Sequence, residues 1–327
     1  MPFFDLALTE LQSFKPKVTE PDDFDEFWKA TLTKSRSKAV PAIFTKVFLG
    51  VSECETFDVT FSGFNGDPIK AWYITPKGTN PETIVVEFNG YGGGRGFPHE
   101  RLAWVSAGFS YFFMDTRGQG SNWGSGGHTA DPFGSQPHTP GSMTMGITNK
   151  DDYYYRRVFT DAVLAIDAIR ESALVSAKGV VVTGVSQGGG IAIAVAGLVE
   201  NLSAALPDVP FLQNFEEAVG MTSADPYQEI VRYLSVHRDQ IEPVFNTLSY
   251  FDGVNFAKRA TAPALFSTAL MDEICPPSTV FAAKNHYQGK ADIEVYRFNG
   301  HEGGQGHHFL KQITWLNQVL DKSTISK

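Results

Sequence analysis

Ser186 lies in the pentapeptide Gly-Val-Ser-Gln-Gly over residues 184–188, a setting that could make its hydroxyl a nucleophile. The β-branched run over 180–183 predicts a buried strand before the pentapeptide, and the alanine-rich segment 191–199 predicts a helix after it. A Gly-x-Ser-x-Gly sequence between a strand and a helix is typical of a sharp turn that exposes a serine. Glycine is needed on both sides because strand and helix approach closely there. The alternative is a glycine-rich turn whose serine has no chemical role.

Such a serine needs a base to accept its proton and a carboxylate to orient that base. His301 and Asp272 are the candidates, because each directly follows a predicted strand, over 292–297 and 264–270 respectively. The chain order serine, acid, histidine is one of the known orders for this trio. A loop histidine and a turn aspartate are the plain structural alternatives.

Two other carboxylates remain alternatives for the acid. Asp225 follows a predicted strand over 218–222, and Glu273 is the neighbour of Asp272. Other histidines are less suitable as the base because they lie inside predicted helices: His286, His307 and His308.

The reaction also needs donors for the oxyanion that forms on an attacked carbonyl. The backbone N–H of Gln187 is one candidate, at the start of the predicted helix. The second is the N–H of Tyr91, in the loop Asn-Gly-Tyr-Gly-Gly-Gly-Arg-Gly over 89–96 that follows a predicted strand over 83–88. A phosphate-binding loop is the alternative, but no register of this loop gives Gly-x-Gly-x-x-Gly or a Walker sequence.

Several polar residues near these loops are expected to support them. Arg117, in Asp-Thr-Arg-Gly-Gln-Gly over 115–120, could clamp an anionic substrate, but a buried guanidinium that holds loop carbonyls is favoured. Gln119 and Glu302 are assigned the same supporting role. His301-Glu302 does not continue into His-Glu-x-x-His, so no metal and no cofactor are expected.

The elements that must position these residues alternate along the chain. This alternation predicts an α/β fold, with a mostly parallel central sheet and helices on both faces, in a single domain over 1–327. We expect an N-terminal extension over 1–50, with a helix at 22–34, and then an antiparallel hairpin of strands 55–61 and 69–75. An irregular loop is expected over 118–148. An insertion is expected over 201–251, and it should be irregular up to residue 215 and helical from residue 227. Further strands are expected at 110–115 and 179–184, and helices at 99–107, 151–172, 186–200, 277–287 and 307–320.

Composition narrows the class of protein further. The 327-residue chain is 42% hydrophobic and 19% charged, and its formal net charge is -9. The acidic balance and the lack of a dense basic run argue against nucleic-acid binding. Segment 191–199 is too short to cross a bilayer, and no signal peptide is evident at the N-terminus. Cys54 and Cys275 suggest no disulfide framework or metal site and are interpreted as reduced thiols of a cytoplasmic protein.

Taken together, these segments resemble the carbohydrate esterase family of acetyl xylan esterases and cephalosporin C deacetylases, over nearly the whole chain. The matching segments are Gly-Tyr-Gly-Gly-Gly-Arg-Gly (90–96), Asp-Thr-Arg-Gly-Gln-Gly (115–120), Tyr-Tyr-Tyr-Arg-Arg-Val (153–158), Gly-Val-Ser-Gln-Gly-Gly (184–189), Asp-Val-Pro-Phe-Leu (208–212), Asp-Glu-Ile-Cys-Pro-Pro-Ser-Thr (272–279) and Gly-His-Glu (300–302).

The resemblance implies an α/β-hydrolase fold and removal of acetyl groups from xylo-oligosaccharides, other sugars or cephalosporins. It implies Ser186, Asp272 and His301 as a catalytic triad, with Tyr91 and Gln187 as oxyanion donors. It also implies a cytoplasmic homohexamer whose active sites face an inner chamber. A serine peptidase or acyltransferase on the same fold, or a non-catalytic binding protein, remains an alternative.

The chain departs from the family pattern at two positions. Asn89 stands where many members have a histidine or an apolar residue, and Met145 stands where arginine is common. Met145 belongs to the family's interface loop, so this change concerns subunit contacts. Residues 118–148 are expected to contribute to the interface, and the aromatic run 153–155 is interpreted as a packing and interface patch.

Overall fold

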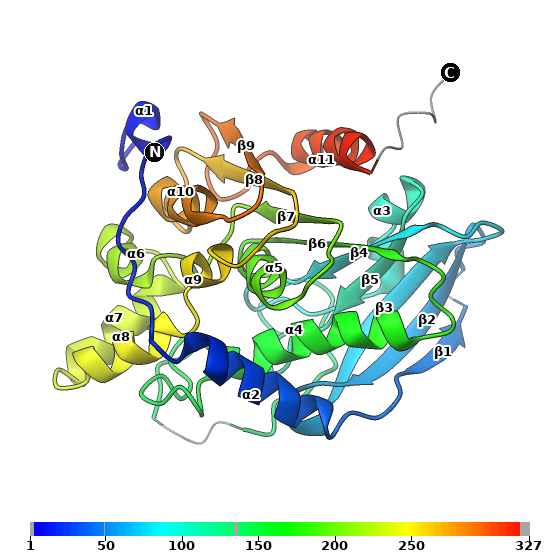
Figure 1. The fold of residues 1–327 in the computed structure, drawn as a ribbon, viewed down its shortest axis with the longest axis horizontal. Coiled ribbons are helices and arrows are strands. Elements are labelled where there is room, and N and C mark those ends of the chain that lie inside the picture. Colours follow the sequence, from blue (N-terminus) through cyan, green and yellow to red (C-terminus); the bar gives the residue numbers. More distant parts are fainter. Residues whose placement is uncertain (1–2, 49, 134–136, 321–327) are drawn as a thin grey trace.

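The computed structural model describes residues 3–48, 50–133 and 137–320, and within them the strands form one nine-stranded sheet in the order β1-β2-β3-β5-β4-β6-β7-β8-β9 (Figure 1). The strands are β1 (Ile43–Val47), β2 (Cys54–Ser62), β3 (Pro68–Pro76), β4 (Thr83–Phe88), β5 (Ser110–Met114), β6 (Gly179–Val185), β7 (Ala204–Asp208), β8 (Ala264–Ala269) and β9 (Ala291–Tyr296).

The helices are α1 (Leu8–Leu11), α2 (Phe24–Arg36), α3 (Ala103–Ser106), α4 (Tyr154–Glu171), α5 (Gln187–Leu198), α6 (Phe215–Met221), α7 (Tyr227–Val236), α8 (Ile241–Ser249), α9 (Gly253–Ala257), α10 (Pro277–His286) and α11 (Gln305–Val319), with 3₁₀ turns η1 (Phe64–Gly66) and η2 (Pro98–Glu100). In the part of the chain just defined, no helix is both long and apolar enough to cross a bilayer.

The sheet has an antiparallel part and a parallel part. Strands β1, β2, β3 and β5 pair antiparallel, whereas β5, β4, β6, β7, β8 and β9 run parallel. All parallel strands therefore end at the same edge of the sheet, which is where open α/β sheets place their sites.

Helices cover both faces of the sheet, and each face has its own apolar core. Val86 and Val182 pack on the side of α2, α4, α5 and α9, whereas their neighbours Val85 and Val181 pack on the side of α3 and α11. Alternate residues of one strand thus belong to opposite cores, as the period of two in a strand requires. Figure 1 shows α11 and α4 on opposite sides of the central strands. The predicted α/β architecture is confirmed.

The region after α5 corrects the sequence-based prediction. Residues 218–222, predicted as a strand, belong mostly to helix α6, and the strand of this region is β7, inside the stretch predicted to be irregular. The carboxylate of Asp252 accepts the N–H groups of Asn214 (3.0 Å) and Phe215 (2.9 Å) and so caps α6 from a distant part of the chain. A strand as short as β7, with a proline at position 207, gives too weak a pattern to be recognised.

Smaller differences concern other segments. The helix predicted at 99–107 is reduced to η2 and the single turn of α3, and the expected N-terminal extension contributes the edge strand β1. Residues 118–133 and 137–148 contain no helix or strand in the described structure, as predicted for this loop. The rings of Tyr153, Tyr154 and Tyr155 are buried in the core, so their predicted packing role is confirmed and the expectation that they form interface surface is wrong.

Candidate active site

Ser186 occupies a strained turn between β6 and α5. Its φ of 58° and ψ of -118° lie in a region that residues other than glycine rarely adopt. A Cβ at Gly188 would lie 2.0 Å from the carbonyl oxygen of Phe88, and one at Gly184 would lie 2.4 Å from the Gly188 backbone. Both flanking glycines are therefore required by packing. The Ser186 N–H donates to the carbonyl of Asp208 at 2.9 Å and ties the turn to the end of β7.

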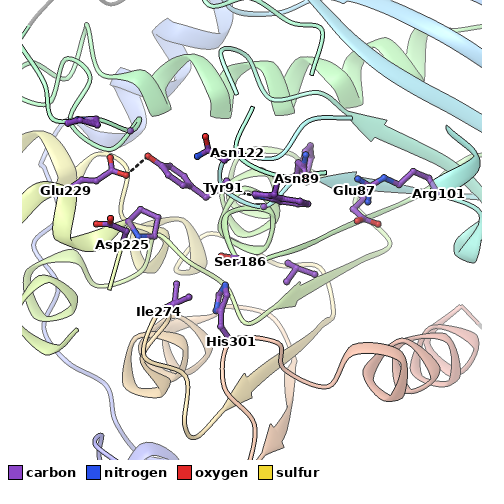
Figure 2. A pocket seen from close by; sticks show the side chains of 17 residues that line it. Glu87, Asn89, Tyr91, Arg101, Asn122, Ser186, Asp225, Glu229, Ile274 and His301 are labelled. Atoms are coloured by element: carbon purple, nitrogen blue, oxygen red, sulfur yellow. Dashed lines mark hydrogen bonds between the residues drawn. The ribbon is translucent and has the colours of Figure 1, made fainter. Parts of the chain in front are cut away.

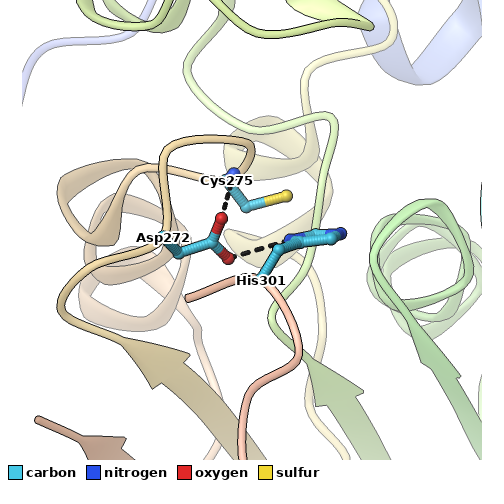
Figure 3. Close-up of side chains that lie close together, drawn as sticks. All are labelled: Asp272, Cys275 and His301. Carbon is cyan, nitrogen blue, oxygen red and sulfur yellow. Dashed lines mark hydrogen bonds and ion pairs between the residues drawn. The ribbon is translucent and has the colours of Figure 1, made fainter. Parts of the chain in front are cut away.

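Asp272 and His301 form a hydrogen-bonded pair on the turns after β8 and β9. Their Oδ2 and Nδ1 atoms are 2.9 Å apart (Figure 3). The Asp272 side chain is fully buried, and its Oδ1 accepts the N–H groups of Ile274 and Cys275, both at 2.9 Å. An ionised Asp272 fixes Nδ1 as the protonated ring nitrogen of His301 and leaves Nε2 free to accept a proton. The His301 side chain is 26% exposed, so solvent and substrate can reach it.

Ser186 and His301 line one cavity of about 710 Å³ (Figure 2). The Ser186 side chain lies beside the thiol of Cys275, and among the described residues no hydrogen bond joins its hydroxyl to His301. Such bonds are often loose before a substrate is bound, and they tighten in the reacting complex. The serine, the imidazole and the buried carboxylate thus meet at the carboxyl ends of β6, β9 and β8.

The alternative acids take no part in this cluster. Asp225 lines the rim of the cavity but follows helix α6 rather than a strand, and it pairs with Arg232 at 2.7 Å. Glu273 contributes its backbone carbonyl to a hydrogen bond with the Thr222 hydroxyl. Asp208 is the last residue of β7 and was missed because that strand was not predicted, but its carboxylate accepts the hydroxyl of Ser267.

Two backbone amides are available where an oxyanion would form. In the described structure neither the Tyr91 N–H nor the Gln187 N–H has a hydrogen-bond acceptor. Gln187 is the first residue of α5, so its amide is one of those that the helix leaves free. Asn89 closes the loop that carries Tyr91. Its side-chain amide donates to the Gly94 carbonyl at 2.7 Å, and its backbone carbonyl accepts from the Gln187 side chain at 3.1 Å. The bond to Gly94 is the contact that depends on an asparagine side chain at this position.

Gln119 connects the loop of Tyr91 to the first turn of α5. Its Oε1 accepts the N–H of Gly92 at 2.8 Å, and its Nε2 donates to the side chain of Gln187 at 2.9 Å. The indole of Trp123 donates to the Tyr91 carbonyl at 2.6 Å. Both contacts come from the irregular segment after β5. They fix the orientation of the peptide units around Tyr91.

Arg117 is fully buried and does not line the cavity. Its guanidinium bonds to Asp161 at 2.6 and 2.8 Å, to Asp67 at 3.0 Å and to Asp131 at 3.3 Å. Burial alone would lower the Arg117 pKa, but these carboxylates raise it above its ordinary value. Arg117 is buried as predicted, but its guanidinium bonds to carboxylates and not to the loop carbonyls that were expected.

Glu302 closes the turn that carries His301. Its carboxylate accepts the side-chain amide of Asn299 at 3.0 Å and the N–H of Gly300 at 3.1 and 3.2 Å. The bond from Asn299 is the largest contribution that lowers the pKa of Glu302, so the group is held as a carboxylate.

Asp272, Cys275 and His301 also form a set of possible metal ligands, with donor atoms within 4.8 Å of one another. A thiol binds a metal as thiolate, and burial raises the pKa of Cys275 well above its ordinary value. The carboxylate and the imidazole already bond to each other. The arrangement therefore favours proton transfer over metal binding.

Three comparisons place the chain among known proteins. Residues 1–319 match the family model described as acetyl xylan esterase. The acetyl xylan esterase from Paenibacillus sp. R4 is 38% identical, with a TM-score of 0.90 over 96% of this chain and 99% of that one. Acetyl xylan esterase 1 from Thermoanaerobacterium sp. JW/SL YS485 is 33% identical, with a TM-score of 0.87 over 97% and 99%. The acetyl esterase Axe7A of Xylanibacter ruminicola is 26% identical over 323 residues, which are 94% of this chain and 69% of that protein.

Proposed function

The chain belongs to the acetyl xylan esterase family and is a carboxylic ester hydrolase that cleaves acetyl esters, and from this premise we propose that it acts through a serine acyl-enzyme. The observation that carries the proposal is the 2.9 Å bond between Asp272 and His301 on turns that share a cavity with the strained Ser186. Ser186 is assigned as nucleophile, His301 as base and Asp272 as the group that orients the imidazole.

In the first half of the reaction, the Ser186 oxygen attacks the acetyl carbonyl carbon while Nε2 of His301 takes the hydroxyl proton. The negative charge that develops on the carbonyl oxygen is met by the amides of Tyr91 and Gln187. Collapse of this intermediate breaks the bond to the alcohol, which leaves with the proton from His301. Asp272 stabilises the imidazolium and keeps its own charge.

In the second half, water attacks the acetyl-serine as His301 removes its proton. The same two amides stabilise the second oxyanion, and its collapse releases acetate and restores Ser186. Every proton passes through His301, so no cofactor is invoked. Organophosphate labelling followed by peptide mapping tests the assignment, and a label on any serine other than Ser186 would refute it.

The alcohol part of the substrate is proposed to be an acetylated xylo-oligosaccharide, another acetylated sugar or a cephalosporin. Polar side chains of Asn122 and Arg101 and the half-exposed indole of Trp123 line the cavity and suit a polyhydroxylated group. The enzyme should cleave p-nitrophenyl acetate and ignore the octanoate ester. Equal kcat/KM values for the two esters would contradict a preference for small acyl groups. Faster cleavage of a peptide or of a longer ester would instead favour a peptidase or an acyltransferase.

The working form is proposed to be a cytoplasmic homohexamer, as in the family that the sequence resembles. Met145 and the irregular segment around it are the proposed interface material. Because Met145 is only partly buried against the core, part of its side chain remains for apolar contact. Light scattering at low and high ionic strength tests this. A monomer in both conditions would refute the hexamer, and dissociation only at high salt would refute the apolar contact.

A further inference from the structure

Glu229 is a buried carboxyl group in the wall of the active-site cavity. It lies on α7, in the insertion between β7 and β8, and is 3% exposed. Its Oε1 accepts the phenol hydroxyl of Tyr91 at 2.8 Å, a bond drawn in Figure 2. Its Oε2 accepts the N–H of Met143 at 3.0 Å. The hydroxyl of Tyr91 in turn accepts the N–H of Ser142. One carboxylate thus joins α7, the Tyr91 loop and the segment before α4.

The segment around Gly141 is folded closely against this carboxylate. A Cβ at Gly141 would lie 2.1 Å from Oε1 of Glu229, and Gly141 has a φ of +114°. The Thr139 hydroxyl donates to the backbone carbonyl of Glu229 at 3.3 Å. The Glu229 carboxylate is thus buried, and each of its oxygens has a donor, from Tyr91 or from Met143. The carboxylate is therefore built into the structure and is not a mobile side chain of the rim.

We propose that Glu229 is a positioning residue of ester hydrolysis, holding Tyr91 by its phenol so that the Tyr91 amide meets the oxyanion. This inference rests on the serine route proposed above. The Tyr91 ring and amide belong to one residue, so a bond at the hydroxyl restrains the rotation of the peptide unit. Oxyanion stabilisation depends on donors that are already in place before charge develops, and small displacements reduce it.

The charge of Glu229 affects how well it can hold Tyr91. Burial raises its pKa to about 7, although hydrogen bonds from Tyr91 and Met143 oppose the shift. The nearby charged groups also act in opposite directions, since Asp225 raises this pKa and Arg232 lowers it. Among the described residues, the phenols of Tyr153 and Tyr155 at the start of α4 also interact with the charge of Glu229.

Above about pH 7 the ionised carboxylate accepts both donors. Below about pH 7, one oxygen of the Glu229 carboxyl group carries a proton and faces either the Tyr91 hydroxyl or the Met143 N–H. The hydrogen bond from that donor to Glu229 must then reverse or break. The positioned state of Tyr91 should therefore become more populated as the pH rises through 7. The neutral amide in Glu229→Gln imitates the protonated form at every pH.

Kinetics of four variants on p-nitrophenyl acetate test the inference. Glu229→Ala should lower kcat by about 10-fold, less than the ~10²- to 10³-fold loss caused by removing an oxyanion donor, with KM little changed. Tyr91→Phe, which keeps the amide, should lose a similar factor, and the double variant should be no worse than either single one. Glu229→Gln should lose less than Glu229→Ala above pH 7, and its activity relative to the unmodified enzyme should fall as the pH rises through 7.

The pH profile separates positioning from a merely structural role. The acid limb of kcat/KM for the unmodified enzyme should contain the ionisation of Glu229, and that of Glu229→Gln should lack it. Glu171→Gln, at an exposed position at the end of α4, is the matched control and should keep it.

Unchanged kcat in folded Glu229→Ala, or additive losses in the double variant, would overturn the role of Glu229 while leaving the serine route intact. Failure of the serine route would instead appear as an active Ser186→Ala enzyme. Circular dichroism and thermal melting of each variant establish that it is folded before its rate is interpreted.

Discussion

The two walls of the cavity are built in different ways. On the acid–base wall, formed by Ser186 and His301 with Asp272 buried behind the imidazole, the three residues lie one, five and three positions after a strand of the parallel sheet. On the oxyanion wall, formed by Tyr91 and the residues that hold it, position depends on side chains from distant segments. Tyr91 and Glu229 are 138 residues apart in the chain. Strand ends position the residues that are proposed to move protons, whereas long-range hydrogen bonds position the residue that is proposed to receive charge.

This difference predicts different responses to substitution. In the proposed serine route the acid–base wall contains the atoms that react, so loss of one of them should remove a chemical step. The oxyanion wall contributes backbone amides that no substitution deletes, so side-chain changes there should displace a donor rather than remove it. Losses on the first wall should therefore be large, and losses on the second wall should be graded.

The largest effect is expected at the nucleophile. Ser186→Ala should lower kcat by roughly 10⁶-fold without changing the fold, because no other group on the wall can form the acyl-enzyme. His301→Ala should lose about as much, and the double variant should be no worse than either, since the residues act as a unit. Initial rates on p-nitrophenyl acetate measure this. A residual rate within a factor of ten of the unmodified enzyme would assign the chemistry to another residue.

A smaller loss is expected at the orienting acid. Asp272→Asn should keep the structure and lower kcat by roughly 10⁴-fold, because an amide favours the wrong tautomer of His301. The same rate assay applied to Asp225→Asn and Glu273→Gln should show far smaller losses, since neither side chain bonds to the imidazole. If either of these proves to be the inactive variant, the acid has been assigned to the wrong residue.

On the oxyanion wall, Gln119→Ala should lower kcat by only about 10-fold. The Gly92 amide and the Gln187 side chain lose a shared partner, but both oxyanion amides remain, so the loss stays below the ~10²- to 10³-fold of a missing donor. Comparison of kcat with KM for the acetate ester checks this. An effect as large as that of Asp272→Asn would remove the proposed contrast between the walls.

The smallest effect on rate is expected at Arg117, which lies behind the oxyanion wall. Arg117→Ala leaves the buried Asp161 carboxylate without its main partner and should lower the free energy of unfolding by about 3–5 kcal/mol. Folded protein at low temperature should keep most of its kcat, because Arg117 does not line the cavity. Chemical denaturation and rate assays on the same sample separate the two quantities. A loss of rate without a loss of stability would indicate direct action on the substrate.

The contrast also explains which parts could be predicted from the sequence. A β-branched strand, glycine-flanked turns and polar residues after strands are local patterns, and they correctly located the turns of Ser186, Asp272 and His301 at one edge of the sheet. The placement of Tyr91 in a glycine-rich loop was also local. Whether these residues carry the roles assigned to them remains a prediction.

Features that depend on distant contacts could not be predicted. Helix α6 begins where the Asp252 carboxylate caps it, and that contact is not visible in the local sequence. Glu229 lies in an ordinary amphipathic helix without any motif, so nothing marked it as a partner of Tyr91. Cys275 was given no role in the site, although the fold places its thiol beside Ser186 and the Asp272–His301 pair.

Trp123 gives the molecule an optical reporter at the mouth of its cavity. Trp123 is 49% exposed, whereas Trp28, Trp72 and Trp104 are 1%, 8% and 5% exposed and Trp315 is only partly exposed. Emission at the long-wavelength edge of the fluorescence spectrum should therefore come mainly from Trp123. Because this ring also bonds to the Tyr91 carbonyl, we expect its emission to respond to ligand occupancy and to movement of the oxyanion wall. Binding to the unlabelled protein can thus be followed by intrinsic fluorescence.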